Sequence, residues 1–316
     1  MKIRVKLSPW WCDTGAVTHR VNKDFIGSHF IDNNIELVDG DDYDFLVVLG
    51  YLKEGEKVCA PPDKVLVFTL EPSWSQNRRD EDSRQFSSRV FITDKTLHES
   101  NYDEYIETPV RMLFGGMGEY HAEPKWDWAV DHMISNDPMQ KDKLLSIVQR
   151  NQECSWIPGQ DENNILYEKR CRLAHAINDS DIDVDIYGEY WEADDRKVKG
   201  TAWSKKLGLL DYKFSMAIEN TVEKNYYTEK FWDCILNQTI PVYYGCPNIY
   251  EIVESDCFIQ LPDISNHSEC MDVINGQCSD VNYNRLFSNL IDLKDRFYNS
   301  PKYNLWHKIR EEIYKT

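Results

Sequence analysis

Short apolar runs that end abruptly at glycine, proline or a polar residue recur along the chain. In the first third they lie at 45–49 (FLVVL), 65–70 (VLVFTL) and 90–92, after an alternating segment at 2–7. Each run has the length of a strand, and segments of mixed composition separate them. Strands at this spacing predict an α/β domain, which we place at residues 1–130.

A second series of strands follows a polar segment at 125–143, which is predicted to be a linker. We expect a second α/β domain over 140–295 and, after the break at Ser300-Pro301, a C-terminal helix over 300–316. A helix is predicted at 165–178. The predicted strands of this domain are 144–148, 184–187, 214–218, 240–244 and 258–261.

The stretch from Tyr212 to Pro247 reads as strand, polar loop, helix, turn and strand. Thr228 is a suitable N-cap, and the apolar positions that follow it have helical spacing, with Trp232 on the flank. A strand-helix-strand unit predicts a parallel sheet, with the loop and the helix N-terminus at the edge where such folds bind ligands. A helix N-terminus attracts anions, and Lys230 lies in its first turn. The pattern alone favours solvated first-turn charges and a simple turn residue at Asn220, because charged first turns are common.

This stretch resembles the signature of family 10 of the glycosyltransferases, the α-1,3/1,4-fucosyltransferases. Ile218 departs from the family, which usually has phenylalanine there. The resemblance is firm over about 144–262, faint over 60–75, and we see none elsewhere. The matching residues are Lys213, Phe214, Glu219, Asn220, Thr221, Tyr226, Thr228, Glu229, Lys230, Pro241, Gly245 and Pro247.

The resemblance implies a GT-B architecture, in which two Rossmann-like α/β domains face each other across a cleft. It also implies that the last helix, here about Tyr303 to Tyr314, crosses back onto the first domain. The implied reaction is transfer of fucose from GDP-fucose to a sugar hydroxyl with inversion at the anomeric carbon. Such a reaction needs cations for the leaving diphosphate and a base for the acceptor hydroxyl.

For the diphosphate, the resemblance points to Lys230 and Arg170. Arg170 resembles the arginine of an arginine-x-x-aromatic helix in the family, and a guanidinium binds phosphate through two parallel hydrogen bonds. The alternatives are Arg172 and Arg150, or a plain surface role for Arg170.

The remaining donor contacts are also carried over from the resemblance. Glu229 corresponds to a ribose ligand, and Tyr226 to a contact to the donor or its phosphate. Asn220 would bind phosphate or hold the loop. Glu219 matches the family's acid near the fucose, and the alternative is a structural acid that accepts hydrogen bonds from loop amides.

For the catalytic base we expect Glu71, at the end of a predicted buried strand. Glu71-Pro72-Ser73 resembles a glutamate-serine-proline-serine motif of animal members, with one residue missing. A carboxylate in a closing cleft can have its pKa raised toward neutrality, as a base requires. Asp94 and His121 are the alternative bases. The structural alternative is that Glu71 is a solvent-exposed acid at the end of a strand.

The amino-acid composition limits the classes of binding partner and the cellular compartment. The formal charge is −18, which argues against nucleic acid or an anionic membrane as the main partner. Hydrophobic residues make up 41% and charged residues 28%, as in a soluble globular protein. No apolar run is long enough to span a bilayer and the N-terminus lacks a signal-peptide core, so we expect a soluble cytoplasmic protein. The nine cysteines contain no C-x-x-C pair, which favours reduced thiols.

The sequence shows no cluster of residues with metal-ligand spacing, so no metal and no cofactor beyond the donor GDP-fucose is expected. A divalent ion could still stimulate the reaction. We therefore predict an inverting fucosyltransferase that forms an α-1,3 linkage to a GlcNAc- or glucose-type acceptor, as a monomer or homodimer. The alternatives are the same fold with another GDP-sugar and a catalytically silent glycan-binding protein.

Overall fold

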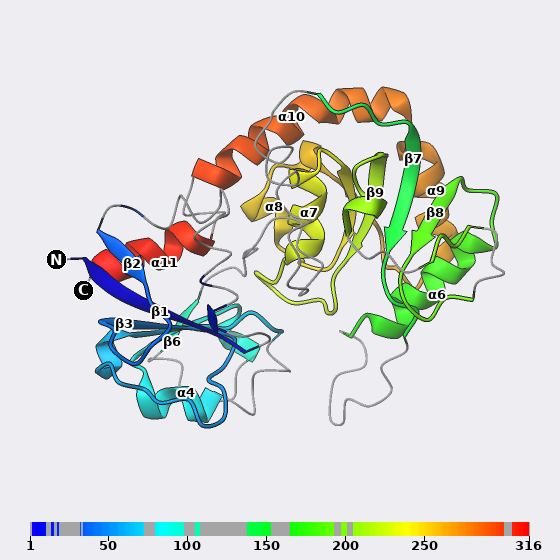
Figure 1. Cartoon of the computed structure of the whole chain (residues 1–316). Coiled ribbons are helices and arrows are strands. Elements are labelled where there is room, and N and C mark those ends of the chain that lie inside the picture. The colour runs from blue at the N-terminus through cyan, green and yellow to red at the C-terminus, as the bar shows by residue number, and fades with distance from the viewer. Residues whose placement is uncertain are drawn as a thin grey trace.

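The computed structural model describes residues 2–10, 14–15, 18, 32, 34–72, 80–97, 105–107, 138–152, 165–192, 197–200, 205–299 and 305–315. Its strands form two sheets in separate halves of the chain (Figure 1). All strand pairs within both sheets are parallel, as the alternation of strands and helices predicts.

The first sheet has the strand order β2-β1-β3-β4-β5-β6. All five side chains of β3 and all four of β4 are buried, which explains why both strands are uninterrupted apolar runs. A short helix, α4 (Asp80–Phe86), precedes β5. The strands are β1 (Ile3–Pro9), β2 (Ile35–Leu37), β3 (Phe45–Leu49), β4 (Val65–Phe68), β5 (Arg89–Ile92) and β6 (Tyr105–Glu107).

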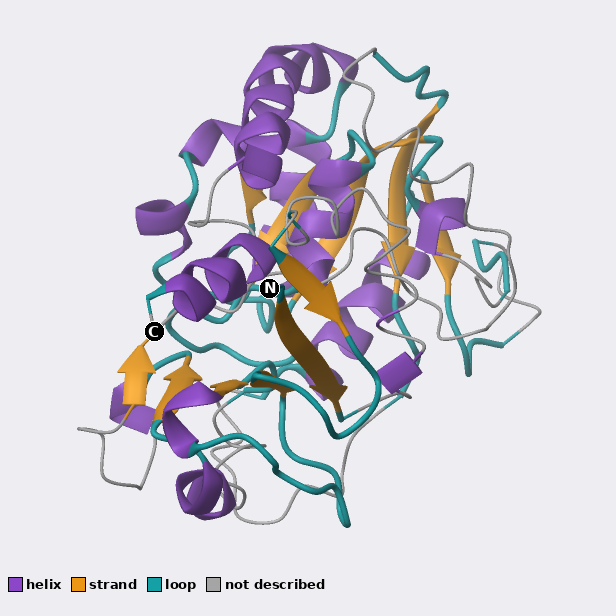
Figure 2. Ribbon diagram, turned by 60° about the vertical axis from the view of Figure 1, so that its left-hand side comes forward, coloured by secondary structure: helices purple, strands orange, loops and turns teal. Residues whose placement is uncertain are grey.

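The second sheet has the order β11-β10-β9-β7-β8, so β9 lies at its centre. Figure 2 shows the strands of this sheet running between helices. The strands are β7 (Lys143–Val148), β8 (Val184–Tyr187), β9 (Tyr212–Ile218), β10 (Ile240–Tyr244) and β11 (Ile259–Gln260). The helices are α6 (Tyr167–Asn178), α7 (Glu229–Leu236), α8 (Ile249–Ile252), α9 (His267–Gln277) and α10 (Asp280–Asn299).

Helix α7 is buried more completely than its sequence pattern predicts. Trp232, expected on the flank, is 0% exposed, so that expectation is wrong. Its ring lies 4.5 Å from that of Phe297 on α10. Because α10 packs over this side of α7, the flank that the local pattern leaves open becomes core.

The end of the predicted linker is also part of the second half. Lys141 is buried, and its ammonium donates to the carbonyl oxygens of Leu209 at 3.0 Å and Asn237 at 2.6 Å, and to the hydroxyl of Thr239 at 3.1 Å. These acceptors match the three donors of an ammonium group, which allows a lysine to be buried. The polar end of the predicted linker around Lys141 is therefore anchored to the second half of the chain. The rest of the predicted linker, residues 125–137, lies outside the described residues.

The last helix, α11 (Leu305–Tyr314), lies beside β1 and β2 of the first half (Figure 1). Helix α10, which precedes it in sequence, runs from the second half toward the first. The guanidinium of Arg89 on β5 donates to the carboxylate of Glu312 at 2.7 Å, and Tyr314 donates to Asp32 at 2.6 Å. The domain boundaries set from the sequence stay predictions, but these contacts fasten the C-terminal helix to the first sheet.

Glu312 gives a pH-dependent prediction for the stability of this C-terminal helix. Burial raises the pKa of its carboxyl, but hydrogen bonds from Lys308 and Lys315 outweigh it, so the net pKa is lowered. A lowered pKa stabilises the fold above the unfolded-state value and loses that effect as the pH falls through the folded-state value. We expect Glu312→Gln to lower the free energy of unfolding by roughly 1.5–3 kcal/mol at pH 7.

The difference between Glu312→Gln and the unaltered protein should shrink as the pH falls below about 4. Urea unfolding at several pH values measures it. A difference that is the same at every pH would show that the charge of Glu312 does not hold α11.

Candidate active site

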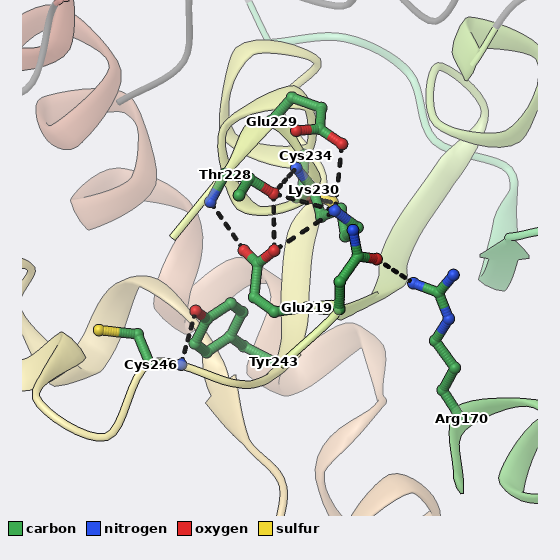
Figure 3. Close-up of polar contacts among 9 residues, drawn as sticks. Arg170, Glu219, Thr228, Glu229, Lys230, Cys234, Tyr243 and Cys246 are labelled. Carbon is green, nitrogen blue, oxygen red and sulfur yellow. Dashed lines mark hydrogen bonds and ion pairs between the residues drawn. The ribbon is translucent and has the colours of Figure 1, made fainter. Parts of the chain in front are cut away.

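Two consecutive residues at the carboxyl end of β9, Glu219 and Asn220, organise the candidate site (Figure 3). Glu219 is 0% exposed. Its carboxylate accepts hydrogen bonds from the backbone N–H of Thr228 at 2.8 Å and from the Thr228 hydroxyl at 2.6 Å. Burial raises the pKa of Glu219, while Lys230 and the Thr228 donors act in the opposite direction. The contacts of Glu219 are therefore those of the structural alternative, an acid that holds the loop.

Thr228 connects Glu219 to the N-terminus of α7. It is the N-cap, as predicted, and its side chain accepts from the backbone N–H of Lys230 at 3.4 Å. The Lys230 ammonium lies 3.1 Å from the same hydroxyl, 3.4 Å from Glu219 and 3.2 Å from Glu229. The side chain of Lys230 is 19% exposed, so its charge is held at the surface of the helix N-terminus.

Arg170 on α6 reaches the same point from the other side of β9. Its Nη1 donates to the side-chain oxygen of Asn220 at 2.8 Å, and its guanidinium lies 4.6 Å from the ring centre of Tyr167. Only 8% of Arg170 is exposed, so the alternative of a surface arginine is wrong. Adjacent residues, Glu219 and Asn220, thus hold Lys230 and Arg170 in one place.

The two alternative arginines have the contacts of surface residues. The side chain of Arg172 is 64% exposed and pairs with Glu168 one turn earlier. That of Arg150 is 62% exposed and pairs with Glu189 at 2.9 Å. Because α6 has 3.6 residues per turn, Arg172 lies on a different side of the helix from Arg170.

Tyr226 links the cluster of Glu219, Asn220, Lys230 and Arg170 to Glu71 in the first half of the chain. The residue is 2% exposed. Burial raises its pKa well above the usual value, and the charges of Glu71, Glu219 and Glu229 add to this effect. Glu71 follows β4 and comes from the other sheet, so its charge acts across the two halves.

Further contacts join the two sheets beside Tyr226. The hydroxyl of Thr93, directly after β5, donates to the buried carboxylate of Glu223. The side chain of Asn225 donates to the Thr93 carbonyl at 2.9 Å, and Asn225 has a positive φ of 62°. Its backbone N–H donates to Asn248 at 2.8 Å. These residues were not predicted, since polar residues in a loop carry no sequence pattern that separates them from solvated ones.

Of the two alternative bases, Asp94 lies in the described part of the chain and His121 does not. Asp94 is 5% exposed, and one carboxylate oxygen accepts from the backbone N–H of Thr96 at 2.9 Å and from its hydroxyl at 2.7 Å. These contacts cap the turn that follows β5 and occupy that oxygen. His121 lies outside the described residues.

Gly245, at the end of β10, has a structural reason to be glycine. A Cβ atom there would lie 2.5 Å from Cγ and 2.6 Å from Cβ of Glu219, and its φ of 154° is unfavourable for other residues. The glycine of the signature therefore leaves room for the buried acid.

Among the residues that the structure describes, no group of three or more His, Cys, Asp or Glu side chains could hold a metal ion. The acidic pair Asp41-Asp42 instead contacts Lys6 and Arg4. In the same part of the chain every helix is too short or too polar to span a bilayer, and the seven cysteines described there form no disulfide with one another.

Replacing Thr228 by alanine tests how the site is held. The change removes a helix cap and one donor to the buried Glu219, so we expect it to lower the free energy of unfolding by roughly 1–3 kcal/mol. Thr228→Ser keeps the hydroxyl and should cost less than about 1 kcal/mol. Urea unfolding measures both variants, and equal losses would mean that the hydroxyl contributes nothing.

The second half of the chain is similar in sequence to known fucosyltransferases. Residues 147–294 match the model described as glycosyltransferase family 10 (fucosyltransferase), C-terminal part. An α-(1,3)-fucosyltransferase of Helicobacter pylori is 36% identical over 71 residues, which are 22% of this chain and 15% of that protein. The human GDP-fucose protein O-fucosyltransferase 3 is 38% identical over 81 residues, 24% of this chain and 17% of that protein. The chain thus spans well under two thirds of these relatives.

Solved structures resemble the whole fold. An α1,3-fucosyltransferase with GDP-fucose aligns with 91% of this chain and 82% of its own, at a TM-score of 0.53 and 17% identity. A DNA-modifying β-glucosyltransferase aligns with 99% of both chains, at a TM-score of 0.55 and 11% identity. The two parallel α/β halves therefore have the GT-B architecture that the resemblance implies.

Proposed function

Because residues 147–294 belong to glycosyltransferase family 10, we propose that this chain transfers fucose from GDP-fucose to an acceptor hydroxyl. The observation that carries the proposal is the pair of cations on adjacent residues: Lys230 contacts Glu219, and Arg170 contacts Asn220. A GDP leaving group carries its negative charge on the diphosphate, and two fixed cations at a helix N-terminus stabilise that charge as it develops.

The charge of the chain makes these two cations more significant. At a formal net charge of −18, the protein as a whole repels an anionic donor. A diphosphate therefore needs positive groups where it makes contact, and Arg170 and the N-terminus of α7 with Lys230 supply them. In this scheme Glu219 is a positioning residue, because its buried carboxylate fixes Thr228 and Lys230.

The nucleoside and the sugar extend to either side of the diphosphate. We assign the ribose hydroxyls to Glu229, whose side chain is 44% exposed at the start of α7 and so can accept hydrogen bonds from a ligand. We assign a donor or phosphate contact to Tyr226, and we give Asn220 the task of orienting Arg170.

We assign the base to Glu71. A base that removes the acceptor proton must lie opposite the leaving diphosphate for an inverting displacement. Glu71 meets this condition in outline, because it comes from the first sheet while the cations come from the second, and its charge acts on Tyr226 at the junction. Inversion, an α-1,3 linkage and a GlcNAc- or glucose-type acceptor are parts of the same proposal.

Incubation with GDP-fucose and a panel of acceptors tests this function. The panel should hold N-acetyllactosamine, lactose, N-acetylglucosamine and serine- or threonine-containing peptides, because one relative is named as a protein O-fucosyltransferase. We expect release of GDP with a sugar acceptor, and GDP binding by calorimetry. GDP-mannose and GDP-glucose in the donor position test the alternative of another GDP-sugar. Neither GDP binding nor GDP release with any pair would contradict the proposal.

A further inference from the structure

Tyr167, the first residue of α6, lies one helical turn before Arg170. At this spacing two side chains on a helix can contact each other. The centre of the Tyr167 ring is 4.6 Å from Cζ of Arg170, a distance at which a guanidinium and an aromatic ring attract each other. Tyr167 lies outside the signature stretch from Tyr212 to Pro247.

Two contacts together fix the guanidinium. The Tyr167 ring lies against the guanidinium, with its centre 4.6 Å from Cζ, and the Asn220 oxygen accepts a hydrogen bond from Nη1 at 2.8 Å. The Nε atom of Arg170 is buried and has no hydrogen-bond partner among the described residues. A buried donor without a partner is costly, so such a group commonly marks a place for a ligand or water.

The free edge of Arg170 has the geometry that a phosphate group needs. In a guanidinium, Nε–H and one N–H of Nη2 point to the same side and form a bidentate donor for oxyanions. The contact to Asn220 uses Nη1 and leaves that edge to a ligand.

We propose that Tyr167 is a positioning residue that holds Arg170 with its Nε–Nη2 edge toward a nucleoside diphosphate. The inference deepens the proposed function and rests on it. Tyr167 acts through the face of its ring, which keeps the guanidinium from turning away when the site is empty. A preorganised cation binds an anion more tightly because less side-chain freedom is lost on binding.

The hydroxyl of Tyr167 also acts on Tyr226, because its charge is among the causes that raise the pKa of that buried tyrosine. The ring and the hydroxyl can be separated by mutation, since Tyr167→Phe keeps the ring and Tyr167→Leu removes it.

Calorimetric titration with GDP and with guanosine tests the proposal on four proteins: the unaltered chain, Tyr167→Phe, Tyr167→Leu and Arg170→Ala. We expect Tyr167→Leu to weaken GDP binding roughly 3- to 10-fold and to leave guanosine binding unchanged, because only GDP carries the diphosphate. Tyr167→Phe should bind GDP within about twofold of the unaltered chain, because its ring is retained.

The double variant Tyr167→Leu/Arg170→Ala shows whether Tyr167 works through Arg170. In that case the double variant binds GDP as weakly as Arg170→Ala alone, because the two effects are not additive. Additive losses, or equal weakening of guanosine, would overturn the inference in favour of a merely structural role. Absence of GDP binding by the unaltered chain would instead overturn the proposed function.

Discussion

Replacing Glu71 by glutamine is expected to lower the rate of fucose transfer by roughly 10²- to 10⁴-fold, the range over which a general base contributes. Glutamine keeps the size and the hydrogen-bonding reach of the side chain but cannot take up a proton. GDP binding should be unchanged, because the cations that bind the diphosphate come from α6 and α7. Initial rates at saturating GDP-fucose, with GDP affinity measured by calorimetry, check both parts.

Asp94→Asn is the matched control, because Asp94 ends the neighbouring strand and was the alternative base. Its carboxylate caps the turn at Thr96, so the variant should lose a little stability and retain most of its transfer rate. The reverse result, full transfer by Glu71→Gln and none by Asp94→Asn, would move the base to Asp94.

Removing either cation is expected to reduce turnover by roughly 10²- to 10³-fold, as loss of one electrostatic partner of a developing charge does. Lys230→Ala and Arg170→Ala should each raise the KM for GDP-fucose and lower kcat, because the diphosphate is bound in the ground state and gains charge in the transition state. Steady-state kinetics with GDP-fucose as the varied substrate measure both constants.

Each cation has a close control. Lys213 is the second residue of β9, its side chain is 19% exposed like that of Lys230, and it pairs with Asp280. Arg172 lies on α6 two residues after Arg170. Lys213→Ala and Arg172→Ala should keep their kinetics within about twofold, since neither contacts the site. Because Lys230→Ala also leaves the buried Glu219 without its cation, unfolding must be measured alongside. Wild-type turnover by a folded Lys230→Ala or Arg170→Ala would remove that residue from the site.

The fold was predictable where burial is uniform. Strands β3 and β10 begin and end where their apolar runs do, because both faces of a parallel sheet are covered. Helix α9 and strand β2 were missed, since one has few buried residues and the other only three positions. The burial of Trp232 could not be predicted either, because α10, which covers it, is distant in sequence.

The site was predictable at positions that the signature spans and unpredictable where the two halves meet. The turn at Thr228 and the charges after it follow from helix chemistry. That Glu219 and Asn220 would each hold one cation depends on the segment before α6 pairing with the residues that follow β9, which no local pattern specifies. The link from Thr93 to Glu223 joins residues 130 positions apart, and neither has a periodic signal.

A crystal soaked with GDP would show whether Lys230 and Arg170 together bind the diphosphate. We expect the diphosphate at the N-terminus of α7, with its oxygens within hydrogen-bond distance of Lys230 Nζ and of the Nε–Nη2 edge of Arg170. A bound GDP whose phosphates contact neither Lys230 nor Arg170 would contradict it.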